Sequence, residues 1–148
     1  MEILAYNIFV MTNISPADPP IEDISRLLTL VGQPVRIQIL FVISGREACV
    51  CHLEAALGLR QSSISQHLMA LRKAGLVTPC REGRNIFYQL EQTGVITLLQ
   101  QAAQLAGIQP DVLQRLGQRP VENCPCPQCN PGMEPAQSCT NPIPKHHK

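Results

Sequence analysis

The sequence predicts a mainly α-helical fold that carries one β-hairpin, and three observations support this class. Apolar residues recur at helical spacing in several segments that glycine and proline separate. Only 3% of the residues are aromatic and none is Trp, so Leu, Ile, Val and Ala must build the core, which favours helices packed on helices. Two runs typical of strands flank Glu82-Gly83-Arg84. The 148 residues suit one domain, with a well-patterned part of about 90 residues.

Two early helices are expected to provide much of the core. The first covers residues 21–31, between Asp18-Pro19-Pro20 and Gly32, whose backbone freedom suits a helix end. The second begins at Pro34, which suits a first helical turn, and is apolar nearly all round until Ser44-Gly45. A helix that is apolar on every side is expected at the centre of a domain.

A helix-turn-helix is predicted next. Residues 51–57 form a short helix that Gly58 closes, and Ser62 or Ser63 can cap a second helix over residues 63–74. Two helices joined by so tight a turn are typical of this motif.

The hairpin follows the second helix of the motif. Its strands are residues 76–81 and 85–90, and it completes a winged helix-turn-helix as the wing. Residues 95–106 return to helical spacing, with more apolar surface than so small a body covers, which indicates a dimerisation helix. Residues 110–116 form a further short helix.

Three segments are expected along the chain. After Pro120 the sequence is rich in Pro, Asn, Gln and Cys and has no periodicity, which indicates a flexible tail. The segments are a flexible N-terminal part over residues 1–20, the winged helix-turn-helix over residues 21–107, and a short helix with a Cys- and Pro-rich tail over residues 108–148.

Basic residues gather in the middle of the chain although the net charge is only +1. Residues 59–90 carry five basic groups and one acidic group, whereas residues 1–58 carry three and six, and residues 91–148 carry four of each. A local basic block suits a phosphate backbone, and a solvated surface explains it equally well.

The sequence indicates a soluble, cytoplasmic protein with no membrane contact. No stretch approaches the roughly 18 apolar residues of a membrane span. Met1 to Met11 are apolar but lack the basic group and cleavage site of an export signal, and Met11 is an equally acceptable start. Thiols stay reduced in the cytoplasm, so seven cysteines indicate metal binding or redox chemistry rather than disulfides.

Three motifs resemble the ArsR/SmtB family of metal-responsive repressors over about residues 22–106. They are Gln61-Ser62-Ser63-Ile64-Ser65-Gln66-His67-Leu68 with Leu71-Arg72 and Gly75-Leu76-Val77, the wing sequence Arg81-Glu82-Gly83-Arg84-Asn85 with Tyr88 and Leu90, and Cys49-Val50-Cys51-His52-Leu53. The last motif is similar to the Cys-Val-Cys box of arsenic- and cadmium-responsive members. The resemblance implies a homodimer that represses from an inverted-repeat operator in double-stranded DNA.

Two features depart from the family's patterns. Glu54 stands where the best-known arsenic sensors have a third cysteine, so the site at the Cys-Val-Cys box is incomplete. The last helix, residues 95–106, has none of the Asp, His and Glu residues of the family's zinc site. Zinc sensing through that helix is therefore not expected.

The second helix of the motif is expected to contact DNA bases, and the wing to contact the backbone. Small polar side chains at a helix start enter the major groove closely and exchange hydrogen bonds with base edges. Basic side chains on the helix end and the wing suit phosphates or the minor groove. The predicted base-reading residues are Ser62, Ser63, Ser65, Gln66 and His67, and the predicted basic contacts are Arg72, Lys73, Arg81 and Arg84.

The cysteines are expected to hold a thiophilic inducer ion. Thiolates select soft ions, so As(III) is the first candidate, followed by Cd(II), Pb(II), Hg(II) and Sb(III). Residues i and i+2 of a helix point about 200° apart, so two such cysteines grip one ion only if the first turn is extended. The predicted ligands are Cys49, Cys51, Cys124, Cys126 and Cys129.

Two arrangements of these ligands remain open. In one, the tail folds over Cys49 and Cys51 and adds one or two sulfurs. In the other, Cys124, Cys126, Cys129 and Cys139 form a separate thiolate site. His52 is either a ligand or an exposed polar residue, and Cys80 is expected to serve packing.

Two other functions compete with an ion-responsive repressor. A thiol redox or persulfide sensor on the same scaffold uses cysteine pairs to form a disulfide instead of binding an ion. A thiol-redox enzyme based on Cys126-Pro127-Gln128-Cys129 lacks the βαβ setting of that motif, so we expect no enzyme.

Overall fold

A computed structural model describes residues 20–83 and 85–132 of the chain. The chain divides into two units, residues 1–32 and 33–148. In the first unit the structure describes helix α2, Ile21–Val31, which has two acidic residues in its first turn and ends at Gly32. The expected flexible segment, residues 1–20, lies outside the described residues except for Pro20.

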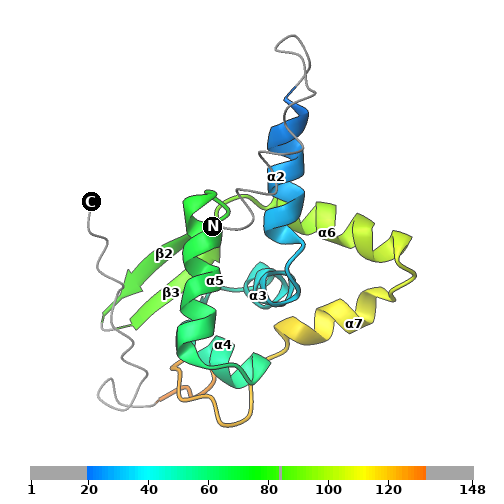
Figure 1. The fold of residues 1–148 in the computed structure, drawn as a ribbon. Coiled ribbons are helices and arrows are strands. Elements are labelled where there is room, and N and C mark those ends of the chain that lie inside the picture. Colours follow the sequence, from blue (N-terminus) through cyan, green and yellow to red (C-terminus); the bar gives the residue numbers. More distant parts are fainter. Residues whose placement is uncertain (1–19, 84, 133–148) are drawn as a thin grey trace. The chain divides into compact units, whose positions relative to one another are not determined.

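The helix-turn-helix, formed by α4, Val50–Leu57, and α5, Gln61–Lys73, packs on a third helix of the second unit, α3, Pro34–Ser44 (Figure 1). Helix α3 is central because it is buried from Ile39 to Ile43 and contacts α4, α5, α6 and the sheet. Gly58 ends α4 in the left-handed conformation (φ 65°), where its N–H donates to the Glu54 carbonyl at 2.9 Å.

The wing belongs to a three-stranded antiparallel sheet. Strands β2, Val77–Glu82, and β3, Asn85–Leu90, form the predicted hairpin, which confirms the winged helix-turn-helix class. A two-residue strand, β1, Ala48–Cys49, pairs with the other edge of β3 and gives the order β1-β3-β2. The sequence analysis did not predict β1.

Three further elements complete the second unit. Helix α6, Gly94–Leu105, packs on α3, and α7, Pro110–Gln114, continues into the 3₁₀ turn η2, Arg115–Gly117, which also contacts α3. Val95, Leu99 and Ala103 form the buried face of α6. These elements agree with the predicted helices at residues 95–106 and 110–116.

Two expectations about local structure are wrong. Helix α5 begins at Gln61 with Arg60 as its N-cap, and no side chain caps it, so Ser62 and Ser63 lie in its first turn. The tail segment, residues 118–132, is not a free tail. It has no helix or strand, but Cys124 and Cys126 within it are buried.

No single helix in the described residues is long and apolar enough to cross a membrane. Helices α2 and α3 reach that length and composition only when they are counted together.

Candidate metal centre and DNA-binding surface

Cys49 and Cys51 meet at the start of α4 because the chain changes from strand to helix between them. Cys49 ends β1 and is the extended N-cap of α4 (φ −80°, ψ 165°), whereas Cys51 lies in the first helical turn. Their Sγ atoms are 2.8 Å apart, and the Cys49 sulfur accepts the His52 N–H at 3.4 Å. The extended turn that two cysteines at this spacing require is therefore present.

The tail segment is held against the chain that precedes β1. The Arg119 guanidinium donates from Nη2 to the carbonyls of Arg46 (2.9 Å) and Glu47 (3.0 Å), and from Nη1 to Gln128. Gln128 in turn donates to the Glu47 carboxylate at 3.0 Å. This polar bridge keeps the intervening cysteines beside α4, where the tail segment is drawn in orange in Figure 1.

His52 faces three sulfurs of the tail segment. Its Nδ1 atom lies 3.5 Å from the Sγ of Cys124, 3.7 Å from that of Cys126 and 3.3 Å from that of Cys129. These four atoms all lie within 4.8 Å of one another. The His52 side chain is fully buried, and in the part of the chain that the structure describes its Nε2 atom has no hydrogen-bond partner.

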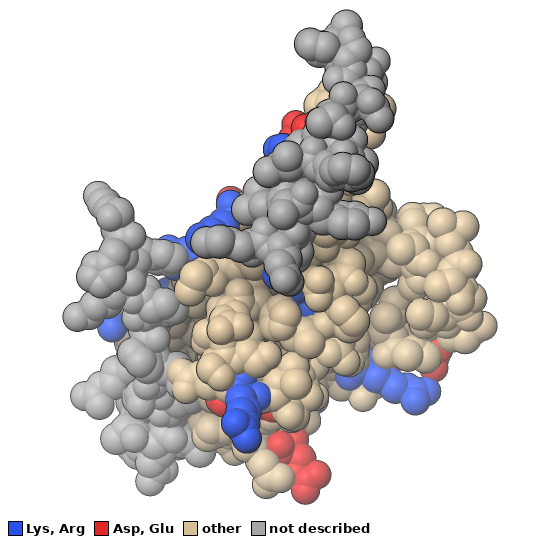
Figure 2. Space-filling model, viewed as in Figure 1, with Lys and Arg blue, Asp and Glu red and all other residues tan. Residues whose placement is uncertain are grey.

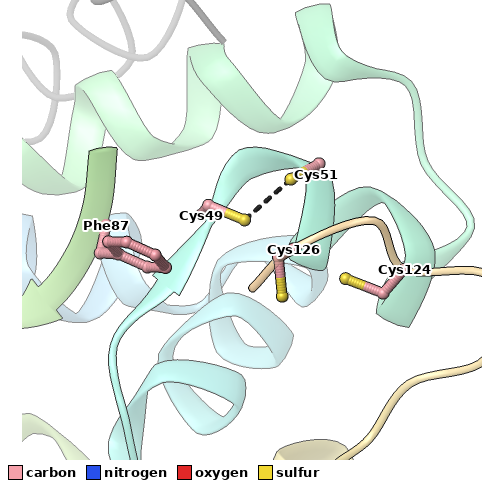
Figure 3. Close-up of a cluster of buried hydrophobic side chains, with 5 residues drawn as sticks. All are labelled: Cys49, Cys51, Phe87, Cys124 and Cys126. Carbon is pink, nitrogen blue, oxygen red and sulfur yellow. Dashed lines mark hydrogen bonds between the residues drawn. The ribbon is translucent and has the colours of Figure 1, made fainter. Parts of the chain in front are cut away.

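Cys126 joins the two groups of thiols. Its sulfur is hydrogen-bonded to Cys49 as well as facing His52. Figure 3 shows the resulting thiol cluster, Cys49, Cys51, Cys124 and Cys126, with the Phe87 ring beside Cys49. Cys129 packs at its edge.

The hydrogen bonds within the thiol cluster shift the pKa values of its cysteines in opposite directions. The Cys49 thiol, with His52 and Cys124, lowers the pKa of Cys126 well below its ordinary range, against the opposing effect of burial. The same bond to Cys126, together with burial, raises the pKa of Cys49. Burial raises the pKa of Cys124. These opposite shifts favour a thiolate at Cys126 over one at Cys49 or Cys124, and the thiolate is the form that binds soft ions.

The structure brings together all five cysteines proposed as ligands and adds a residue that the sequence analysis left undecided. His52 is buried against the tail cysteines and is not an exposed polar residue. The only sign of this in the sequence is that His52 directly follows the Cys-Val-Cys box. Cys80 is exposed on β2 and so does not serve packing. Cys139 lies outside the described residues.

The thiol cluster touches both parts of the winged helix-turn-helix. Cys51 and His52 belong to α4, which packs directly on α5. Cys49 pairs with Phe87 across β1 and β3, so the cluster also contacts the sheet of the wing. A change at these sulfurs therefore reaches both elements through direct contacts.

The predicted DNA-contacting residues of α5 lie on its exposed face and on the flanks of its buried face. Ile64, Leu68 and Leu71 pack inward. Ser62, Gln66 and Lys73 are exposed, and Ser63, Ser65, His67 and Arg72 are half-buried. Burial, and secondarily the charge of Arg36, lower the pKa of His67, so its ring is neutral at neutral pH.

Of the two basic side chains expected on the wing, the structure describes one, Arg81. Arg81 is exposed, and its Nε donates to the Gly83 carbonyl at 3.3 Å, whereas Arg84 lies outside the described residues. On the face drawn in Figure 2 the described surface is mostly uncharged, and Lys and Arg side chains are few. Charge alone therefore does not mark the DNA interface, which has to be located from the fold.

Comparisons with known proteins identify that fold. The profile of the bacterial regulatory protein, arsR family, matches residues 33–78. The HTH-type transcriptional repressor SmtB of Mycobacterium tuberculosis is 37% identical over 95 residues, which are 62% of this chain and 70% of the relative. The SmtB homologue of Synechocystis is 30% identical over 82 residues, 55% of this chain, and the match spans only 62% of that relative's length.

A solved structure agrees with these relatives. The homodimeric winged helix-turn-helix DNA-binding domain Mb0332 of Mycobacterium bovis superposes with a TM-score of 0.55 at 26% identity, over 66% of this chain and 91% of that one. The curated relatives are transcriptional regulators, which confirms the expectation of a DNA-binding regulator rather than an enzyme. The chain therefore belongs to the ArsR/SmtB family of bacterial transcriptional regulators.

Proposed function

We propose that this protein is a metal(loid)-responsive repressor that leaves operator DNA when a thiophilic ion binds its cysteines. The observation that carries the proposal is the thiol cluster itself, which joins the tail segment to the start of α4, the helix that packs on α5. Five cysteines and a histidine at such a point have little use in packing alone. The relatives named SmtB are repressors, which supports the direction of the response.

The proposed inducer is As(III), with Sb(III), Cd(II), Pb(II) and Hg(II) as further candidates. A soft ion selects thiolates over oxygen ligands. Once Cys51, which is disulfide-bonded in this structure, is reduced, Cys49, Cys51 and Cys126 supply three sulfurs for it, because Cys126 is hydrogen-bonded to Cys49, whose sulfur lies 2.8 Å from that of Cys51. Cys126 of the tail segment thus supplies the third sulfur, which the best-known arsenic sensors take from a cysteine at the position of Glu54 here.

The chain's own residues transmit the change. Three sulfurs drawn around one ion must move from their thiol positions, and two of them are anchored in the first turn of α4 and its cap. Helix α4 packs on α5, and Cys49 is paired with Phe87 in the sheet of the wing. We therefore expect the angle between α5 and the wing to change, which lowers affinity for DNA.

Operator binding is proposed to use a homodimer. Ser62, Ser63, Ser65, Gln66 and His67 read bases, and Arg72, Lys73, Arg81 and Arg84 contact the backbone. The solved neighbour Mb0332 is homodimeric, and here Leu105 at the end of α6 is 92% exposed, which suits a contact with a second copy.

The test is operator binding by fluorescence anisotropy with reduced full-length protein. As(III), Sb(III), Cd(II), Pb(II), Hg(II) and Zn(II) are each titrated into the complex of protein and operator. We expect As(III) to release wild-type protein and to fail with Cys51→Ser. Cys80→Ser is the matched control, because Cys80 is exposed and outside the cluster. The proposal is contradicted if the wild-type protein stays on the operator with every ion, or if Cys51→Ser and Cys80→Ser lose the response to As(III) equally.

A redox sensor is the second candidate, because Cys49 and Cys51 are already in sulfur-to-sulfur contact. In reduced protein, a peroxide that takes two electrons and two protons from the Cys49 and Cys51 thiols would leave one disulfide and two waters. This candidate is favoured over the first if peroxide releases the protein from operator DNA in metal-free solution and no ion does. Cys51→Ser should abolish that release.

A further inference from the structure

We propose that His52, Cys124, Cys126 and Cys129 form a tetrahedral site for a divalent ion of the Zn(II) class, which shares only Cys126 with the trio proposed for As(III). The inference rests on the proposed function only in that both sites use Cys126. It assigns a second ion and gives the tail segment a role in holding it.

The distances between the ligand atoms match those of a tetrahedral site. Zinc lies about 2.0–2.1 Å from histidine nitrogen and about 2.3 Å from cysteine sulfur, so nitrogen and sulfur at the corners of a tetrahedron are about 3.5 Å apart. The Nδ1 atom of His52 lies 3.3, 3.5 and 3.7 Å from the three sulfurs. All four atoms lie within 4.8 Å of one another, so one ion can reach every ligand with small shifts.

The burial of His52 supports a ligand role. Its side chain is fully buried, and Nδ1 faces only sulfurs in the contacts described. A buried polar ring that is satisfied only by weak thiol contacts is costly, whereas a bond from Nδ1 to an ion offsets that cost. Three cysteines and one histidine are also a ligand set that structural zinc sites use.

The local structure of the tail segment favours the same arrangement. The backbone folds back at Cys129, whose N–H donates to the Cys126 carbonyl at 3.1 Å. The Val121 N–H donates to the Cys129 sulfur at 3.4 Å, which helps to hold this sulfur in place. Arg119 and Gln128 fix both ends of this loop to residues 46–47.

Cys51 distinguishes the two sites. Its sulfur contacts Cys49 and is not one of the four atoms grouped around His52. His52 and Cys129 belong only to the tetrahedral set, and Cys51 belongs only to the trio. Single substitutions at these positions therefore separate the sites.

The experiment titrates Co(II), a spectroscopic substitute for Zn(II), into reduced, metal-free, full-length protein. We expect one ion per chain with the visible absorption of tetrahedral, sulfur-rich Co(II), which added Zn(II) removes. Removing a contact that only supports a metal ligand typically lowers metal affinity about 10- to 100-fold. Removing a ligand itself should cost more, so we expect Cys129→Ser and His52→Ala to bind Co(II) at least about 100-fold more weakly. Cys80→Ser is the matched control and should retain the spectrum, because Cys80 is exposed and is not one of the four ligands.

Cys129→Ser keeps the test independent of folding, because Cys129 is only half-buried and lies outside the helices, whereas His52→Ala empties a buried position. An unchanged spectrum in Cys129→Ser, or its loss in Cys80→Ser, overturns the proposed site. Absence of a tetrahedral spectrum while As(III) still releases the operator refutes this site alone. A tetrahedral spectrum in a protein that no ion releases from DNA supports this site and refutes the proposed function.

Discussion

Replacing Arg119 with Ala should detach the tail segment while the helix-turn-helix stays folded. The guanidinium donates to two backbone carbonyls before β1, at 2.9 and 3.0 Å, and also to Gln128. Hydrogen bonds from a charged donor contribute about 1.5–3 kcal/mol, and Arg119 is partly exposed, so we assign that range to the whole set rather than to each bond. This corresponds to a roughly 10- to 150-fold larger undocked population of the tail segment.

Pulsed alkylation followed by mass spectrometry measures that population directly. Cys126 is fully buried in the docked tail, so in reduced, metal-free protein its labelling rate follows the undocked fraction. We expect the rate to rise roughly 10- to 150-fold in Arg119→Ala, with an unchanged helical circular-dichroism spectrum.

Arg115→Ala is the matched control for this measurement. Arg115 forms an exposed ion pair with Asp111 at 2.9 Å on the neighbouring turn. Such pairs contribute little, and this one does not involve the tail segment, so labelling of Cys126 should stay at the wild-type rate. Equal labelling in both variants would show that Arg119 does not hold the tail.

Three further predictions concern DNA binding and the turn of the motif. Gln66→Ala should lose about 1–3 kcal/mol of affinity for the operator and little for random DNA, measured by anisotropy; equal losses on both would contradict base reading. Lys73→Ala should weaken binding to both DNAs alike and reduce the slope of log affinity against log salt by about one, and a slope that stays at the wild-type value would exclude a phosphate contact. Gly58→Ala should lower the free energy of unfolding by about 1–2 kcal/mol, because φ is +65° there, although nothing lies within 4 Å of an added Cβ. Gly45→Ala, with φ −87° and equally open space, is its control in urea unfolding and should be neutral or stabilising.

The helices and the hairpin could be predicted from the sequence because their signals are local. The apolar spacing of α3 and α5 and the turn at Gly83 lie within the elements that they define. The start of α5 was misplaced because Ser62 and Ser63 are favourable caps, whereas the helix begins at Gln61 and uses no side-chain cap.

The docking of the tail segment could not be predicted in the same way. It depends on contacts between residues more than 70 positions apart, such as Cys124 with His52 and Arg119 with Arg46. A segment without periodicity gives no sign of such contacts, so it resembled a flexible tail. The five cysteines were found because thiols in a reducing compartment are informative by type, whereas the role of His52 depends on where the tail lies.

The separation of the four ligands along the chain limits how much an ion can stabilise the fold. Cys124, Cys126 and Cys129 lie within six consecutive residues, whereas His52 lies 72 positions before the first of them. An unfolded or newly synthesised chain therefore keeps three of the four donors together and binds the ion almost as a short peptide does. Because affinity for the unfolded chain reduces the stabilisation that a ligand provides, the melting temperature should rise less than the affinity of the folded protein suggests. The stability that the ion adds to the folded protein then comes mainly from its single bond to His52.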